Sequence, residues 1–133
     1  MKFVSTRIET EWNNPKLNAR LKVIVAEASA YALQRWKWEF TITSIHRNPE
    51  EDAALKASGV HSHWRAVDVR TRGRSQKVID DVAAYINKRW VYDPRRPSLK
   101  VCFAEPHGTG PHAHFQVHDN TKRMAEPAKS KPK

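Results

Sequence analysis

Residues 112–118 alternate strictly between polar and apolar side chains, and this alternation constrains the fold more than any other feature of the chain. In order, the segment reads His112, Ala113, His114, Phe115, Gln116, Val117 and His118. A period of two is that of a β-strand with one face in the core and one polar face. The sequence therefore predicts a closing strand that carries two histidines, His112 and His114, on the same face.

A second strand is predicted just before this one, through Leu99, Val101 and Phe103. The connecting residues 106–111 include two prolines and two glycines, which is typical of a tight turn. A turn this short joins neighbouring strands in antiparallel fashion. Runs rich in β-branched residues over 40–45 and 66–71 predict two further strands.

Two long helices are predicted from capping residues followed by apolar positions at helical spacing. Asn14 and Pro15 predict the start of the first helix, because asparagine caps helices and proline suits their first turn. The apolar stripe of this helix runs through residues 17–32. Ser75 is the predicted cap of the second helix. The apolar face of that helix holds Val78, Ile79, Val82 and Ile86.

A shorter helix is expected between the first two strands. Residues 48–51 form a capped start, with Glu51 at the position that completes a capping box, and the helix should end at Gly59. The alternation of helices and strands, with antiparallel strands at the end, predicts an α+β fold. We expect its helices to pack on a small, mainly antiparallel sheet.

The chain length of 133 residues and an apolar content of 39% suit one hydrophobic core. We therefore expect a single domain over residues 1–120, followed by a basic, disordered tail over residues 121–133. The only cysteine, Cys102, excludes an internal disulfide and a zinc site built from several cysteines. Any metal site must therefore rest on histidine, aspartate or glutamate.

The first residues have no apolar stretch of the kind found in secretory signals, and no apolar run approaches ~18 residues. These observations predict a protein made in the cytoplasm, without a membrane span.

The net charge of +10 predicts an anionic partner such as a cell-wall polymer, nucleic acid or lipid headgroup. One basic cluster around residues 65–77 predicts either a groove for an anionic polymer or a solvated turn. Its members are Arg65, Arg70, Arg72, Arg74 and Lys77.

Two histidine clusters indicate a metal site. One is His61 and His63, just before the predicted strand that carries Asp68, and the other is the pair on the closing strand. Adjacent strands lie about 4.8 Å apart, so side chains from neighbouring strands can meet around one ion. Zinc binds imidazole nitrogen and carboxylate oxygen at roughly 2.0–2.2 Å, and a catalytic zinc uses three protein ligands. Asp68 lies between two valines and needs a partner or a metal if it faces inward.

Three segments resemble the family of zinc D-Ala-D-Ala carboxypeptidases and L-alanyl-D-glutamate endopeptidases. Residues 42–50 are similar to a strand that ends in Ser-x-x-Arg, with Ser44 and Arg47 at these positions. Residues 59–69 are similar to the motif Ser-x-His-x-x-Gly-x-Ala-x-Asp, and residues 112–117 are similar to a closing His-x-His strand. The family includes bacteriophage endolysins and shares its zinc-site architecture with the hedgehog signalling domain.

The resemblance implies one zinc ion held by His61, Asp68 and His114, with His63 outside the site. It implies that Arg47 holds the substrate or stabilises the oxyanion, a role that suits a permanently charged, planar guanidinium. Ser44 and Trp64 are then expected to contact substrate.

Two residues are candidates for the proton shuttle. We favour His112, because it shares a strand face with His114. Glu105 is the rival, because the carboxypeptidase branch uses a carboxylate as its base.

The function that follows is zinc-dependent hydrolysis of peptide bonds in bacterial peptidoglycan, at a stem or cross-link peptide, by a monomer of the endolysin type. Such an enzyme would reach the wall through a partner membrane pore. Gly59, Trp64 and Pro111 depart from the family pattern, which leaves a second hypothesis of a zinc-binding module without catalysis, serving in wall binding or in a virion. A basic nucleic-acid-binding domain is a third hypothesis.

Overall fold

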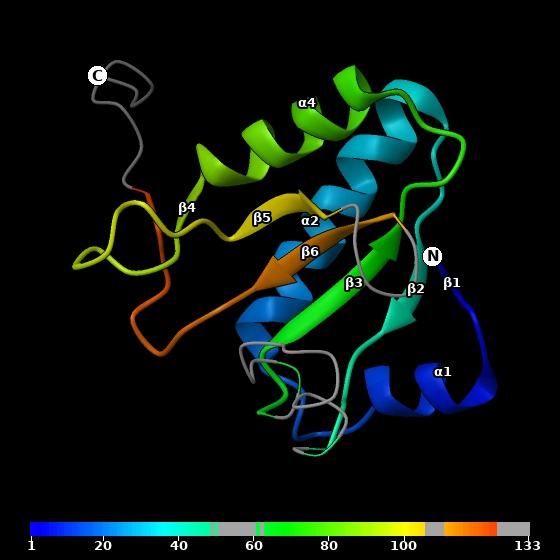
Figure 1. Cartoon of the computed structure of the whole chain (residues 1–133), viewed down its shortest axis with the longest axis horizontal. Coiled ribbons are helices and arrows are strands. Elements are labelled where there is room, and N and C mark those ends of the chain that lie inside the picture. The colour runs from blue at the N-terminus through cyan, green and yellow to red at the C-terminus, as the bar shows by residue number, and fades with distance from the viewer. Residues whose placement is uncertain (49, 51–60, 62, 106–110, 125–133) are drawn as a thin grey trace, which may run out of the picture.

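A computed structural model describes residues 1–48, 50, 61, 63–105 and 111–124 of the chain. A five-stranded sheet in the order β1-β2-β3-β6-β5 forms its centre (Figure 1). Its strands are Lys2–Phe3 (β1), Thr41–Ser44 (β2), Ala66–Arg70 (β3), Cys102–Glu105 (β5) and His112–Gln116 (β6). Only the β1–β2 pair is parallel among these neighbours. The predicted α+β class with a mainly antiparallel sheet is therefore confirmed.

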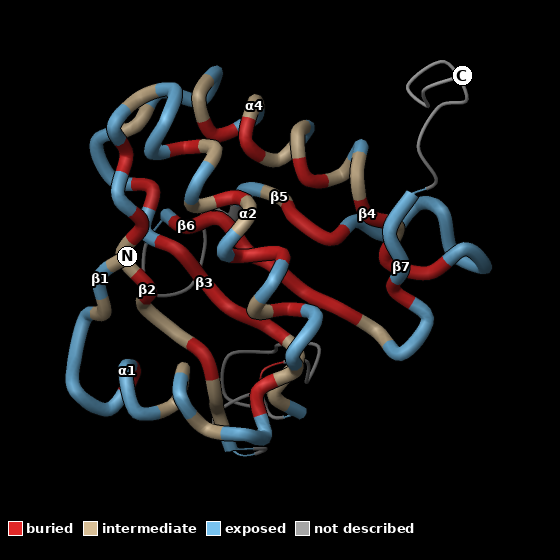
Figure 2. The backbone as a smooth tube through the Cα atoms, turned by 180° about the vertical axis from the view of Figure 1, so that it is seen from behind, coloured by how far each residue is buried: buried red, intermediate tan, exposed pale blue. Residues whose placement is uncertain are grey.

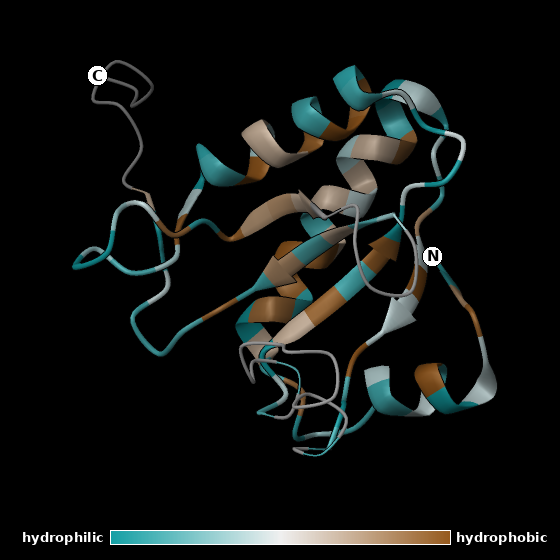
Figure 3. Ribbon diagram, in the orientation of Figure 1, coloured by the Kyte–Doolittle hydropathy of each residue, from teal (hydrophilic) through white to brown (hydrophobic). Residues whose placement is uncertain are grey.

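Two helices, α2 (Ala19–Trp36) and α4 (Gln76–Asn87), cover one face of the sheet, as Figures 1 and 2 show from opposite sides. Their buried residues follow the predicted apolar stripes. They meet the odd-numbered residues of β3 and β6, namely Val67, Val69, Ala113 and Phe115. Polar and apolar residues consequently alternate along β3 and β6 in Figure 3. The even-numbered residues of both strands lie on the face away from the helices.

The start of α2 differs from the prediction. The cap is Asn18, whose side chain accepts a hydrogen bond from the backbone N–H of Leu21 at 3.1 Å. Asn14 instead accepts from Lys16 N–H at 2.8 Å, so it closes a local turn before the helix. The predicted cap of α4 is confirmed, because Ser75 accepts from Val78 N–H.

Helix α1 (Thr6–Trp12) was not expected from the apolar pattern. It is short and buries only Ile8, so its periodic signal is weak. Its capping residue, Ser5, accepts from Ile8 N–H. Glu11, near its end, accepts from His46 N–H and so ties α1 to the residues after β2.

Strand β5 is shorter than predicted, because Leu99 lies in a turn and is exposed. Cys102 begins the strand and is buried, and burial raises the pKa of its thiol. The Asn87 side chain donates to the Cys102 carbonyl at 2.7 Å and accepts from its N–H at 3.1 Å. These two hydrogen bonds join the end of α4 to β5.

Residues 121–124, the first part of the predicted disordered tail, belong to the fold. Lys122–Arg123 forms strand β7, which pairs with β4 (Trp90–Val91) in a separate two-stranded sheet. The Arg123 guanidinium binds Glu27 on α2 at 2.7 Å, and this ion pair helps to fix the short strand. The rest of the predicted tail lies outside the described residues, as do most of the helix predicted between residue 48 and Gly59 and residues 106–110 of the predicted 106–111 turn.

Candidate metal centre

Asp68 lies at the centre of the candidate site. It occupies the middle of β3, directly opposite His114 of β6, on the sheet face turned away from the helices. Both residues are buried, with 2% and 6% of their surface exposed. Directly paired residues on neighbouring strands share a face, so the antiparallel register brings the carboxylate to the imidazole. Asp68 Oδ1 and His114 Nδ1 are 2.9 Å apart.

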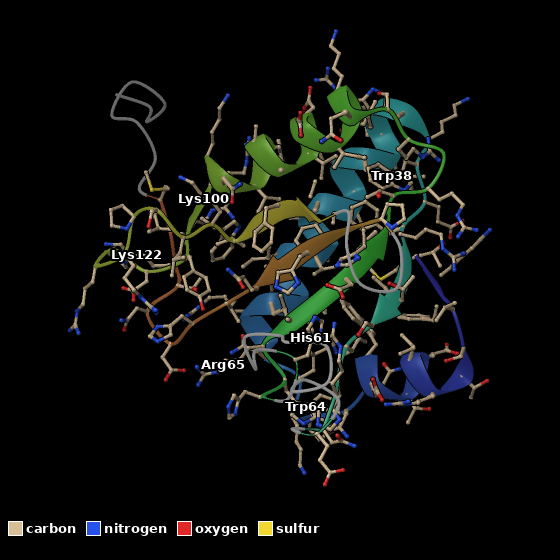
Figure 4. The ribbon with its side chains drawn as sticks, in the orientation of Figure 1. Trp38, His61, Trp64, Arg65, Lys100 and Lys122 are labelled. Carbon is tan, nitrogen blue, oxygen red and sulfur yellow. The ribbon has the colours of Figure 1, made fainter. Side chains whose placement is uncertain are left out.

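His61 joins this pair from the segment before β3 (Figure 4). It is buried, and its Nε2 lies 3.4 Å from Asp68 Oδ2. Ligand-type atoms of His61, Asp68 and His114 all lie within 4.8 Å of one another. The structure therefore brings together the three residues that the family resemblance implies as ligands. His63 is exposed and is not part of this group.

A backbone carbonyl fixes the proton of His61. Nδ1 lies 2.8 Å from the carbonyl oxygen of Ile45, which can only accept a hydrogen bond, so Nδ1 carries the proton. In the neutral imidazole, Nε2 then presents a lone pair toward the Asp68 carboxylate. Consistent with this, Nε2 is buried and has no hydrogen-bond partner within the described part of the chain.

A side-chain amide orients His114 in the same way. The Gln116 amide nitrogen donates to the Lys100 carbonyl at 2.9 Å, which leaves the amide oxygen facing the imidazole. That oxygen lies 3.1 Å from His114 Nε2 and accepts its proton. Neutral His114 therefore directs the Nδ1 lone pair at Asp68.

Two imidazole lone pairs and one carboxylate thus converge, and this arrangement requires a cation, either bound metal or added protons. The donor set of two nitrogens and one oxygen suits zinc, and hydrogen bonds that the outer imidazole N–H groups donate to carbonyl or amide oxygens are usual around bound zinc. Two ligands of a tetrahedral zinc ion lie roughly 3.4 Å apart. The separation of His61 Nε2 and Asp68 Oδ2 matches this spacing. The three side chains could therefore hold a metal ion.

The charge of Asp68 is stabilised within this group. Burial by itself would raise the pKa of the carboxyl, but when His114 and His61 carry the added protons, their hydrogen bonds and positive charge outweigh burial and hold the pKa of Asp68 well below its ordinary value. Asp68 is therefore available as an anionic ligand.

Arg47 also reaches the centre. Its guanidinium Nη2 lies 3.2 Å from Asp68 Oδ2, and the side chain is 17% exposed. The residue expected to contact substrate is thus placed beside the candidate ligands, with its charge next to the carboxylate.

The two candidates for the proton shuttle lie opposite each other on neighbouring strands. His112 is buried, and its Nε2 lies 3.6 Å from Asp68 Oδ2. Glu105 is the register partner of His112 on β5. The position of the Glu105 side chain lies outside what the structure describes.

The remaining expected substrate contacts have different surroundings. A bulge in β2 shifts the register so that Ser44 pairs with Asp68, although Ile42 pairs with Val69 in the core. Trp64 stacks on His46, with ring centroids 4.4 Å apart. Its backbone is left-handed, with φ of 61°, at the position where the family pattern has glycine. The structure therefore places Ser44 beside the centre and Trp64 in a packed aromatic pair.

Sequence reasoning missed the outer partners of the histidines, which are Ile45 and Gln116, and the ring of Phe103 near His114. The Phe103 and His114 centroids are 4.9 Å apart. Gln116 could have been found from its position, because it follows His114 by two residues and so shares its strand face. The Ile45 carbonyl has no side-chain signal.

Comparisons with protein-family models, with curated proteins and with solved structures found no match to this chain. No helix in the described residues is long and apolar enough to cross a membrane.

Proposed function

We propose that this protein is a zinc-dependent hydrolase whose metal is held by His61, Asp68 and His114. The observation that carries the proposal is the convergence of two oriented imidazole lone pairs on one buried carboxylate. Three protein ligands leave a position for water, which is typical of catalytic rather than structural zinc. A zinc ion bound here would lower the pKa of water and polarise a substrate carbonyl.

The remaining residues have roles that follow from their positions. Arg47, whose charge lies beside the ligands, would orient the substrate and stabilise negative charge on its carbonyl oxygen. His112 would accept a proton at an imidazole nitrogen and deliver it to the leaving amine. Glu105 is the alternative proton carrier, because it is the register partner of His112.

We propose bacterial peptidoglycan peptides as the substrate. The support is the resemblance of residues 42–50, 59–69 and 112–117 to the peptidase family, together with a net charge of +10 that suits an anionic wall. We likewise propose the hedgehog-type zinc peptidase architecture, action as a monomer, and release to the wall through a partner pore during phage infection.

The direct test is hydrolysis of purified cell walls. Protein stripped with a chelator should release no new peptide amino groups, and added zinc should restore the release. His114→Ala should lose zinc and activity, whereas His63→Ala, which removes an exposed histidine outside the group, should retain both. Release that continues in chelator, or loss of zinc in His63→Ala alone, would contradict the proposal.

A zinc-binding module without catalysis is the second candidate function. Two observations favour it: Pro111 stands where the carboxypeptidase branch has an acid, and Trp64 holds a left-handed backbone beside the site. Tight stoichiometric zinc with no peptide release from any wall preparation would support this alternative.

A further inference from the structure

One peptide group connects helix α1 to the candidate metal centre. The carbonyl of Ile45 and the N–H of His46 belong to the same planar unit, and in a trans peptide these two groups point in opposite directions. The carbonyl oxygen lies 2.8 Å from Nδ1 of His61. The N–H donates to Oε1 of Glu11 at 3.1 Å. Glu11 and His61 therefore contact opposite sides of one rigid unit.

The side chain of Glu11 is itself held in place. Its second oxygen, Oε2, accepts from Nε of Arg7, one turn earlier on α1, at 2.9 Å. Only 12% of the Glu11 side chain is exposed. The carboxylate faces the segment that leaves β2, beside which α1 lies in Figure 1. A hydrogen bond from a backbone N–H to a carboxylate is strong, so this contact restricts rotation of the peptide that it binds.

The direction of the Ile45 carbonyl determines the state of the His61 ring. The carbonyl accepts the Nδ1 proton, which leaves the Nε2 lone pair facing Oδ2 of Asp68 at 3.4 Å. If the peptide rotated, its N–H would face Nδ1, and the proton of the neutral ring would move to Nε2. The lone pair for a metal would then be lost. The bond to Glu11 also polarises the peptide, which makes the carbonyl a stronger acceptor.

A ring stack joins the same segment to the backbone beside His61. The imidazole of His46 stacks on the indole of Trp64, with ring centroids 4.4 Å apart and planes inclined by 13°. The Trp64 N–H donates to the His61 carbonyl at 3.1 Å, and the Trp64 carbonyl accepts from Asn18 N–H at 3.1 Å. His46 is therefore held by Glu11 through its backbone and by Trp64 through its ring.

We propose that Glu11 is a positioning residue for the metal ligand His61, acting through the peptide between Ile45 and His46. The inference rests on the proposed function for the role of His61 as a metal ligand. A carbonyl that orients a ligating histidine is usual. The inference adds that the carbonyl is itself oriented by a carboxylate, so that α1 contributes to metal affinity from outside the group of ligands.

Zinc affinity, measured by competition with a chromogenic chelator, tests the proposal. Glu11→Ala removes the acceptor and should weaken zinc binding about tenfold, the lower end of the effect of losing an outer partner of a ligand. Glu11→Asp keeps the charge but shortens the side chain, so it should lose nearly as much. Glu11→Gln keeps an oxygen at the original reach and should recover most of the affinity. Rescue by the amide and not by the shorter acid requires a role of position rather than charge.

The matched control is Glu9, an exposed acid on the same helix. Glu9→Ala and Glu9→Asp should leave zinc affinity unchanged. Equal losses in Glu9→Ala and Glu11→Ala would mean that net charge or the stability of α1 determines the affinity, and would overturn the proposal. Wild-type affinity in Glu11→Ala would overturn it as well.

The Nδ1 proton of His61 provides a readout that requires neither metal nor turnover. In ¹⁵N-labelled protein its NMR signal should be protected from exchange with water, with and without zinc, because the ring is buried and a carbonyl holds the proton. Glu11→Asp should reduce this protection about fivefold, the size expected for one lost hydrogen bond, and Glu11→Gln should retain it. Unchanged protection in Glu11→Asp would overturn the proposal, even if Glu11→Ala fails to fold.

The positioning role and the proposed function fail separately. If the wild type binds no zinc, the zinc hydrolase is rejected, and the His61 signal of the metal-free protein still decides whether Glu11 orients the ring. If the wild type hydrolyses cell walls and Glu11→Asp keeps both its zinc affinity and its protected proton, the hydrolase is retained and the role of Glu11 is rejected.

Discussion

Two buried aspartates in this protein have contrasting surroundings. Asp93 follows β4 and is 3% exposed, and donors occupy both of its carboxylate oxygens. Its Oδ1 accepts from Arg95 N–H at 3.0 Å and from the Asn120 amide at 3.3 Å, and its Oδ2 accepts from the Arg96 guanidinium at 2.9 Å. Asp68 is equally buried, but two of its neighbours are imidazoles whose protons are held elsewhere.

The difference distinguishes an aspartate that stabilises a loop from one that can bind a metal. Donors with fixed protons satisfy Asp93, and two of these donors come from the next three residues of the chain. Asp68 accepts a hydrogen bond from the Arg47 guanidinium, but the lone pairs of His61 and His114 also face it, and all of these groups come from segments that only the folded sheet brings together. A buried carboxylate that faces other hydrogen-bond acceptors is stabilised when a cation binds between them. Such an arrangement therefore identifies a candidate metal site.

The largest expected effect comes from exchanging each carboxylate for an amide. Asp68→Asn should lose zinc completely, so that its melting temperature in zinc falls to that of the metal-free wild type. Asp93→Asn should keep zinc and instead lower the melting temperature of the metal-free protein. Zinc analysis and thermal unfolding with and without chelator measure both effects. If both variants keep zinc, Asp68 is a structural residue like Asp93.

The next effect concerns His112, which lies near Asp68 but outside the three-residue group. His112→Ala should retain zinc and lose about 10²–10⁴-fold in kcat, the usual contribution of a proton carrier. His118→Ala is the control, because it removes a histidine that lies outside the three-residue group, with its Nδ1 4.0 Å from Asp93. Glu105→Gln should cost much less than His112→Ala. The reverse order would assign proton transfer to Glu105.

A smaller effect should follow from removing the amide that orients His114. Gln116→Leu keeps the volume of the side chain but leaves His114 Nε2 without its acceptor. We expect zinc affinity to fall about 10–100-fold, as is usual when an outer partner of a ligand is lost. Competition with a chromogenic chelator measures the affinity. Gln76→Leu, an exposed glutamine on α4, should leave it unchanged.

The smallest effect distinguishes the two aspartates by pH. The backbone N–H of Arg95, and after it the Arg96 guanidinium, lower the pKa of Asp93 below its ordinary value of 3.8, against the opposing effect of burial. A lowered carboxyl pKa contributes stability above the unfolded pKa, and this contribution is lost as the pH falls through the folded pKa. In chelator, the melting-temperature difference between wild type and Asp93→Asn should hold above about pH 5 and close below 3.8. A difference that grows as the pH falls below 3.8 would contradict this.

Much of the sheet could be predicted because its alternation is regular. The pattern of residues 112–118 predicts which side chains of β6 face the core, and the capping signal at Ser75 predicts α4. The signals for α1 and β4–β7 are too short for periodicity, and two similar caps, Asn14 and Asn18, compete at the start of α2.

The three candidate ligands could be predicted from spacing and resemblance, but the orientation of their imidazole rings could not. Two features of the site have no signal in the amino-acid sequence. They are the bulge that pairs Ser44 with Asp68 and the Ile45 carbonyl beside His61. Such features depend on backbone geometry, which only the assembled sheet defines. For Gln116, the sequence predicts that its side chain shares the strand face of His114, but not that its amide orients the His114 ring.

The rate at which the buried thiol of Cys102 reacts with a reagent can report how often this fold opens. A thiol with a raised pKa and no access to solvent reacts very slowly with disulfide reagents while the protein is folded. Asn87 holds the Cys102 backbone through two hydrogen bonds, so we expect separation of the end of α4 from β5 to bring solvent to the sulfur. The labelling rate of the unmodified chain therefore reports the population of that opened form. Because the only native cysteine is buried, a cysteine introduced on the surface would be labelled selectively.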